Sequence, residues 1–259
     1  MPPVLDLHAS ATAAFAVSGC LLLLWALSLV LRDSSIVDIF WGPAFALVAW
    51  VSFAVHPAPG PRALLAAALT TLWGVRLGGY LFWRNHRRAE DPRYTAMRWR
   101  HGEAWWWRSL FIVFGLQGAL VWVVSLPVQA AIASPGALGA LDLAAAAVAL
   151  FGVGFESLAD LQLARFKASP GGKGALMTRG LWSWTRHPNY FGDFTTWWGL
   201  GLLGLAADAP WSLLGPAVMA FLLMRVSGVP LLEKAMRDRP GHADYVARTS
   251  AFFPRPPRR

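Results

Sequence analysis

The sequence predicts an all-α membrane protein: a polytopic bundle of about seven transmembrane helices, forming one integral membrane domain over residues 1–259. The first observation is composition, since 56% of the residues are hydrophobic, only 14% are charged, and the mean hydropathy is +0.44. The second is that apolar runs of about 20 residues, the length that crosses the hydrocarbon core, recur along the chain. The third is that the charged residues gather between these runs.

Seven runs are expected to cross the membrane, at residues 10–31, 36–56, 63–83, 109–133, 139–162, 189–207 and 210–232. Of the 23 Lys and Arg residues, all but Arg62, Arg76 and Arg225 fall on one side of these spans or in the tail. The positive-inside rule therefore predicts an outer N-terminus and an inner C-terminus. Because topology accounts for the net charge of +9, no nucleic acid partner is expected.

The sixth span begins with the polar stretch at residues 178–193. Asn189 and Asp193 are four residues apart and share one helix face, which is costly at membrane depth unless they bind something. His187, directly before Pro188, suits a general acid or base, a ligand contact or a helix cap. No second His stands at metal-ligand spacing and the chain has one Cys, so no metal site is expected.

Glu156 and Asp160 are four residues apart near the inner end of the fifth span. Like charges at this spacing repel each other, so partners are expected. In one interpretation the helix end emerges into water and the acids pair with Arg165 or Lys167. In the other they face the bundle interior and accept hydrogen bonds from a bound ligand.

A glycine-rich loop with interspersed cations follows the fifth span, comprising Lys167, the Pro170–Gly174 segment, Lys173 and Arg179. Flexible backbone and positive charge suit phosphate groups, although a solvated turn whose cations serve topology explains Lys173 equally well. Residues 199–204 match the Gly-x-Gly-x-x-Gly pattern. They lie inside an apolar span, where small residues permit close helix packing, so we do not interpret them as a dinucleotide fingerprint.

Two polar residues lie in the second and third spans. Asp38 and Arg76 neutralise each other at membrane depth in one interpretation. In the alternative, Asp38 and Tyr80 line a substrate cavity and are catalytic, because a phenol can donate a proton to a carbonyl oxygen.

Five segments carry a resemblance to a known family: residues 38–42, 90–94, 178–192, 227–234 and 245–254. Together they resemble the DUF1295 family of bacterial membrane proteins, within the steroid 5-alpha-reductase superfamily. The resemblance implies a seven-helix fold in the bacterial inner membrane. Its cytoplasmic half, about residues 136–259, would hold NADPH, and its membrane half, about residues 1–135, would hold a lipophilic substrate in contact with membrane lipid.

The resemblance implies an oxidoreductase that transfers hydride from NADPH to a carbon–carbon double bond conjugated to a carbonyl, in a steroid-like or isoprenoid-like substrate. Asn189 and Asp193 match the Asn and Glu of the cofactor motif of the steroid reductases, and Asp160 matches a cofactor-contacting Asp of the preceding helix. The full expected cofactor-binding set is Glu156, Asp160, Lys167, Arg179, His187, Asn189, Tyr190, Asp193, Tyr245, Arg248 and Thr249. The Gln-Glu pair that grips a steroid ketone in the steroid reductases is absent, so the resemblance does not specify a steroid.

Two other functions remain open. The Arg186-His187-Pro188 sequence, followed by a C-terminal Glu, is similar to isoprenylcysteine and phospholipid methyltransferases, which use S-adenosylmethionine. Those enzymes usually show a paired Glu where this chain has Glu233-Lys234, and they lack the pairing of Asn189 with Asp193. The third candidate is a lipid-binding membrane protein without catalysis.

Overall fold

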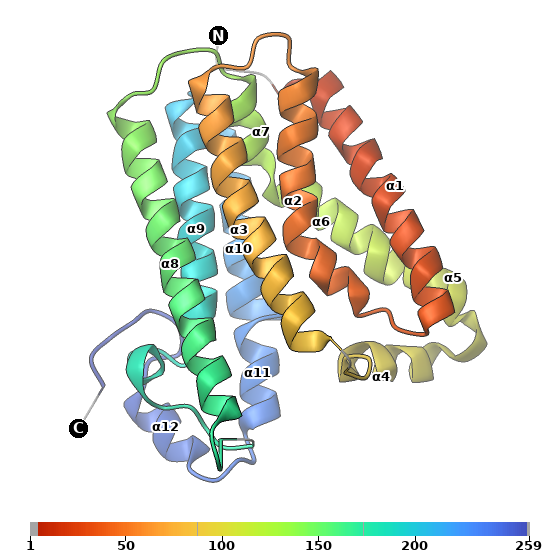
Figure 1. Ribbon diagram of the computed structural model, residues 1–259, viewed down its shortest axis with the longest axis vertical. Helices are drawn as coiled ribbons and strands as arrows, with labels where there is room; N and C mark the ends of the chain where they lie inside the picture. Colours follow the sequence, from red (N-terminus) through yellow and green to blue (C-terminus); the bar gives the residue numbers. More distant parts are fainter. Residues whose placement is uncertain (1–4, 87, 173, 258–259) are drawn as a thin grey trace. The chain divides into compact units, whose positions relative to one another are not determined.

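The computed structural model describes residues 5–86, 88–172 and 174–257, and these residues form helices joined by loops (Figure 1). The described part of the chain contains no β-strand, only one isolated bridge between Thr185 and Ser250. The predicted all-α class is confirmed. The α-helices are α1 (Leu7–Leu31), α2 (Ile36–Val55), α3 (Pro61–Asn85), α4 (Pro92–His101), α5 (Trp105–Ser109), α6 (Leu116–Val124), α7 (Leu126–Ala133), α8 (Ala140–Ala168), α9 (Pro188–Ala206), α10 (Leu214–Phe221), α11 (Val229–Met236) and α12 (His242–Arg248).

Shorter turns extend several of these helices. Three of these turns are 3-10 helices: Gly102–Ala104, Gly180–Ser183 and Pro210–Leu213. Two are π-helical: Leu110–Gly115 and Leu222–Val226. The first π-turn leads into α6 and the second follows α10. The fourth and the last apolar runs therefore each form one long helix that a π-turn interrupts.

Six helical segments are long and apolar enough to cross a membrane, counted over the residues that the structure describes: Leu7–Leu31, Ile36–Val55, Pro61–Asn85, Pro92–Val124, Ala140–Ala168 and Pro210–Met236. They correspond to six of the seven predicted spans. The remaining one, 189–207, forms α9 but is not among the six. Its sequence includes Asn189, Asp193, Thr195 and Thr196, which lower its hydropathy. The predicted orientation stays a prediction.

The chain divides into two compact units, which we describe separately. The first comprises Met1–Leu143 with Leu200–Gly215, and the second Ala144–Gly199 with Pro216–Arg259. The predicted halves meet near residue 135, whereas the units divide at residue 143 and the segment 200–215 belongs to the first.

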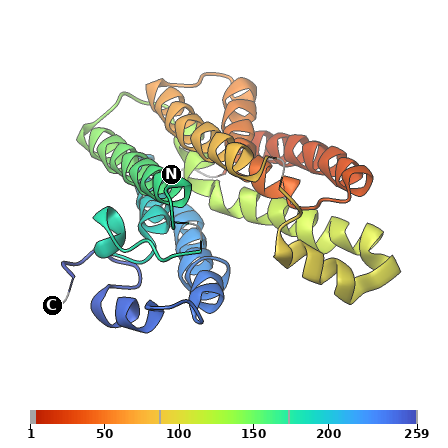
Figure 2. The same ribbon diagram turned by 60° about the horizontal axis from the view of Figure 1, so that its bottom comes forward.

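In the first unit, α1, α2 and α3 lie side by side, as Figures 1 and 2 show in red to orange. A Cβ atom added to Gly42 would lie 2.4 Å from the carbonyl oxygen of Gly74, so the backbones of α2 and α3 are in contact there. Phe45 and Trp73 pack edge to face beside this contact, with ring centroids 5.6 Å apart, and both are fully buried.

Helix α1 presents most of its apolar surface outward. It is the most apolar of the six segments, yet only 17% of its most apolar stretch of 18 residues is buried. Phe15, Leu23 and Val30 are each more than 70% exposed. Such a face is stable in lipid and not in water, as expected for a transmembrane helix.

Local signals set the ends of the helices in the first unit. Asp6 begins α1 by accepting a hydrogen bond from the Ala9 amide at 3.0 Å. Pro61 and Pro92 occupy the first turns of α3 and α4, where the missing proline N–H is tolerated. Arg32 ends α1 in the left-handed conformation, with φ of 53°.

In the second unit, the part of α8 after residue 143 packs closely against α9. A Cβ atom on Gly152 would lie 2.4 Å from the Thr196 amide nitrogen, and one on Gly192 would lie 2.5 Å from the Glu156 amide nitrogen. Only glycine permits this approach, and it brings the polar residues of the two helices together.

Candidate functional site

Four polar side chains of the second unit gather where α8 and α9 approach each other. Glu156 and Asp160 of α8 are each 3% exposed, and Asp193 of α9 is 8% exposed. Nδ2 of Asn189 donates a hydrogen bond to Oδ1 of Asp160 at 3.3 Å. The structure therefore places these acids inside the unit and joins Asp160 to Asn189, while their binding of a ligand stays a prediction.

The orientation of the Asn189 amide follows from its partner. A carboxylate accepts hydrogen bonds, so the NH₂ group faces Asp160 and Oδ1 faces away. This Oδ1 atom is buried and has no hydrogen-bond partner among the described residues. A buried acceptor without a donor is costly, and a ligand with N–H or O–H groups would satisfy it.

Directly before α9, Arg186 and His187 both bond to Glu233 of α11. Nε of Arg186 donates to Oε1 of Glu233 at 2.7 Å, and Nε2 of His187 lies 2.8 Å from the same oxygen. On the other side of the carboxylate, Nε2 of His242 lies 3.3 Å from Oε2 of Glu233. One carboxylate thus holds the start of α9, α11 and α12 together within this unit.

His187 is oriented by Glu233 and Tyr190. Because a carboxylate only accepts, Nε2 of His187 is the donor in this contact. The ring stacks on Tyr190 with centroids 5.7 Å apart and planes inclined by 12°. Nδ1 of His187 is buried and has no hydrogen-bond partner among the described residues. The same is true of Oδ1 of Asn189, two residues further along the chain.

The C-terminal tail packs against the segment before α9. The Arg186 amide donates to the Ser250 carbonyl at 2.9 Å, and the Thr185 hydroxyl donates to the Phe252 carbonyl at 2.8 Å. NH1 of Arg186 donates to the carbonyl of Thr249 at 2.6 Å. Thr249, one of the predicted site residues, is buried, and its backbone carbonyl accepts this hydrogen bond from Arg186.

Tyr245 of α12 is buried and its hydroxyl donates to the carbonyl of Trp182. Burial raises the pKa of the Tyr245 phenol above its usual value, and the Glu233 carboxylate adds to the shift. Trp182 in turn donates from Nε1 to the carbonyl of Ala159 on α8, at 3.1 Å. Tyr245 thereby links α12 to α8 through Trp182.

The three predicted phosphate-binding cations, Lys167, Arg179 and Arg248, have exposed side chains. Nε of Arg248 donates to the carbonyl of Asp244 at 3.4 Å. Lys173, predicted with them, lies outside the described residues. Their contact with phosphate stays a prediction.

In the first unit, Asp38 of α2 is bound by two residues of α4. The hydroxyl of Tyr94 donates to Oδ1 of Asp38 at 2.6 Å, and NH2 of Arg93 donates to Oδ2 at 2.8 Å. Tyr94 is 6% exposed. The arginine that ion-pairs with Asp38 is thus Arg93, whereas Arg76 was the partner considered from the sequence.

Tyr80, predicted as catalytic together with Asp38, contacts guanidinium groups. The Cζ atoms of Arg76 and Arg84 lie 5.6 Å and 5.8 Å from the centre of its ring, within the range of cation–π attraction. Its catalytic role stays a prediction.

Five residues of these two clusters were not predicted as site residues: Arg93, Tyr94, Arg186, Glu233 and His242. A signal was present for four of them, since Arg186 and Glu233 belong to the quoted motifs and Arg93 and Tyr94 belong to the 90–94 segment. Pattern alone did not indicate that Glu233 bonds to His187 or that Tyr94 bonds to Asp38. Among the described residues, no group of three or more His, Cys, Asp or Glu side chains is arranged to hold a metal ion.

Comparison with known proteins gives two matches. The sequence matches DUF1295, a family described as protein of unknown function, over residues 24–249. It is also 29% identical over 270 aligned residues to an uncharacterized protein of the fission yeast Schizosaccharomyces pombe, an alignment that covers 90% of this chain and 76% of the yeast protein. No solved structure matches the chain.

Proposed function

We propose that this chain, which belongs to the DUF1295 family, is an NADPH-dependent membrane oxidoreductase that reduces a carbon–carbon double bond conjugated to a carbonyl in a lipophilic substrate. The cofactor site is the polar cluster of the second unit, on the cytoplasmic side of a bacterial inner membrane. The observation that carries the proposal is the buried Asn189 amide, whose NH₂ group is held by Asp160 while its oxygen lacks a donor.

The chemistry of the cluster fits the sugar and amide parts of a nicotinamide nucleotide. Glu156, Asp160 and Asp193 are buried carboxylates, and Oδ1 of Asn189 is a buried acceptor without a donor. A ligand that supplies a hydrogen-bond donor would satisfy this oxygen. Ribose hydroxyls and a carboxamide NH₂ group are such donors, whereas phosphates are not and need cations.

Cations for the phosphates are available at the surface of the same unit. Lys167, Arg179 and Arg248 are exposed, and their positive charge suits an anionic ligand. A dinucleotide with buried sugars and outward phosphates would use both sets of residues. When bound, NADPH supplies the hydride; the chain holds and orients the nucleotide and excludes water.

The proton that accompanies the hydride requires a separate group. Tyr94 holds a proton at its phenolic oxygen, 2.6 Å from Oδ1 of Asp38, and Arg93 keeps the carboxylate in place. To protonate the substrate, the phenol would turn its proton from Asp38 to the reacting atom, so that the O–H bond of Tyr94 breaks as the new bond forms. We therefore propose Tyr94 as the partner of Asp38 in the substrate half.

One observation also favours a second function. Three buried carboxylates in the cluster suit a ligand that carries positive charge, and S-adenosylmethionine has an ammonium and a sulfonium group in addition to its ribose. A methyltransferase would use the same cluster and would not need the exposed cations. The two functions thus differ in which nucleotide binds.

The test is nucleotide binding to the purified protein, followed by the change in NADPH fluorescence. We expect NADPH to bind and Asn189→Ala to abolish the response, while Asn85→Ala, which alters an amide at the end of α3, leaves it unchanged. Binding of S-adenosylmethionine without an NADPH response would exclude the reductase and support the methyltransferase. Absence of both responses would favour a lipid-binding protein without catalysis.

A further inference from the structure

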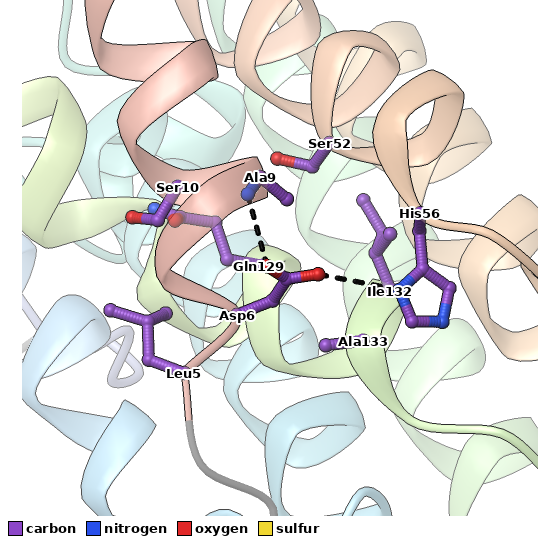
Figure 3. Close-up of a pocket in the computed structure, with 9 residues that line it drawn as sticks. All are labelled: Leu5, Asp6, Ala9, Ser10, Ser52, His56, Gln129, Ile132 and Ala133. Carbon is purple, nitrogen blue, oxygen red and sulfur yellow. Dashed lines mark hydrogen bonds and ion pairs between the residues drawn. The ribbon is translucent and has the colours of Figure 1, made fainter.

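A small polar cavity lies in the first unit, apart from the residues proposed for catalysis. Figure 3 shows its lining, which comes from the start of α1, the end of α2 and from α7. Its polar side chains are Asp6, Ser10, Ser52, His56 and Gln129. The space open to the centre of a water-sized molecule is about 10 Å³, which is roughly the room that one water needs.

Three of these side chains have a buried polar atom without a hydrogen-bond partner among the described residues: Oγ of Ser52, Nδ1 of His56 and Oε1 of Gln129. Oγ of Ser52 and Oε1 of Gln129 are buried, make no hydrogen bond to any described residue, and belong to residues that are 3% and 4% exposed. A helical serine commonly bonds to the carbonyl one turn earlier, and Ser52 does not. Leaving both groups dry would be costly.

The Gln129 amide is oriented by its other contacts. The hydroxyl of Ser125 donates to the carbonyl of Trp122 at 2.9 Å, which uses its only proton. Ser125 can therefore only accept from Gln129, whose Nε2 lies 2.8 Å away. The group left at the cavity is consequently the acceptor Oε1.

The rest of the wall is already hydrogen-bonded in part. Oδ1 of Asp6 accepts from the Ala9 amide at 3.0 Å, and Oδ2 lies 3.5 Å from Nδ1 of His56, as the dashed lines in Figure 3 mark. Ser10 accepts from Nε1 of Trp122 at 2.9 Å and retains its own proton. The wall thus offers both donors and acceptors around one small space.

We infer that this cavity is a specific site for one buried water molecule, which joins α1, α2 and α7. A water can donate to Oε1 of Gln129 and accept from the hydroxyl of Ser52, and it still has a proton for Nδ1 of His56 or Oδ2 of Asp6. A sodium ion of similar size is disfavoured, because the one carboxylate already accepts a backbone N–H and lies against an imidazole. The water holds the beginning of the first span to the rest of the unit.

The site is tested by thermal unfolding of the purified full chain in detergent, with Ser52→Ala, Gln129→Leu and the double variant. Ser52 and Gln129 share no direct hydrogen bond, so an energetic coupling between them reports a molecule that both contact. We expect Ser52→Ala to lower Tm by roughly 2–4 °C and to have a clearly smaller effect in the Gln129→Leu background. The matched control is Ser28→Ala on α1, a buried hydroxyl that donates to the Trp25 carbonyl at 2.7 Å; its effect should be the same in both backgrounds.

Three results would overturn the inference. A higher Tm for Ser52→Ala would show a dry cavity, because the variant then removes only an unsatisfied hydroxyl. Strict additivity of the two substitutions would show that no shared molecule is bound. A Tm that rises with sodium but not with choline, and loses this dependence in Ser52→Ala, would show a sodium site. If Gln129→Leu fails to fold, the direction of the Tm change in Ser52→Ala and the sodium titration still distinguish a bound water from a dry cavity and from a sodium site.

Discussion

Oε1 of Glu233 accepts hydrogen bonds from both Nε2 of His187 and Nε of Arg186, at 2.8 Å and 2.7 Å. His187 and Glu233 are 46 residues apart in the sequence. Their contact orients the His187 imidazole and ties the segment directly before α9 to α11. The order of the site therefore depends on one carboxylate.

Replacing Glu233 by Gln should destabilise the protein. Arg186 is 8% exposed and His187 is fully buried, so loss of the charge leaves a buried guanidinium without its counter-ion. Removing one partner of a buried ion pair costs about 3 kcal/mol or more, and part of this will be regained because the amide still accepts. Thermal unfolding of the purified protein measures the effect. Asp238→Asn, on an exposed residue of the same C-terminal segment, is the control, and an equal shift in both variants would contradict the assignment.

The close contact of α8 and α9 predicts opposite outcomes for two neighbouring glycines. Gly152→Ala places a Cβ atom 2.4 Å from the Thr196 amide nitrogen and should cost roughly 1–3 kcal/mol through displaced backbone. Gly154→Ala meets nothing within 4 Å and should stabilise the helix by up to about 1 kcal/mol. Unfolding temperatures distinguish the two, and equal behaviour would show that α8 and α9 are farther apart than described.

The network around Glu90 predicts a loss of stability in acid. Burial would raise the pKa of Glu90, but hydrogen bonds from Arg98 and the Ser34 amide outweigh it, so the pKa lies below the usual 4.5. Because the folded state binds the proton less tightly than the unfolded state, the stabilisation is complete above about pH 4.5 and is lost as the pH falls through the folded pKa. Tm measured against pH should fall in this range, and Glu90→Gln should flatten the fall. A wild-type curve that stays flat there would contradict the network.

The pairing of Tyr94 with Asp38 predicts a catalytic effect without loss of cofactor. Under the proposed reductase function, Tyr94→Phe removes the phenolic proton and should lower kcat by about two orders of magnitude while NADPH binding is retained. Tyr80→Phe tests the earlier prediction from sequence in the same assay. Normal turnover of Tyr94→Phe would show that its hydrogen bond to Asp38 is structural.

Much of the fold could be predicted from the sequence, because apolar runs of membrane length are a strong signal. Prediction from the sequence was less accurate in two places. One is α9, where polar residues interrupt the apolar run, and the other is the pair of π-turns that extend helices. Residue type and spacing indicated that Asn189 and Asp160 need partners, and the family resemblance placed both in the cofactor set, but the hydrogen bond between them was not predicted.

The contacts of Glu233 and Tyr94 were not predictable in the same way. Glu233 reaches His187 only because the chain returns after α10, and Tyr94 reaches Asp38 only because α4 lies against the start of α2. Tyr80 and Tyr94 are both tyrosines between the second and fourth spans. Which of the two tyrosines lies beside Asp38 depends on side-chain packing, and the periodicity of the sequence gives no information on that.

The most direct test of the account is the identity of the nucleotide that copurifies with the protein in mild detergent, determined by mass spectrometry after denaturation. The account predicts NADPH or NADP⁺ in the wild-type preparation and its loss in Asn189→Ala. Recovery of S-adenosylmethionine or its demethylated product, without a nicotinamide nucleotide, would contradict the proposed reductase.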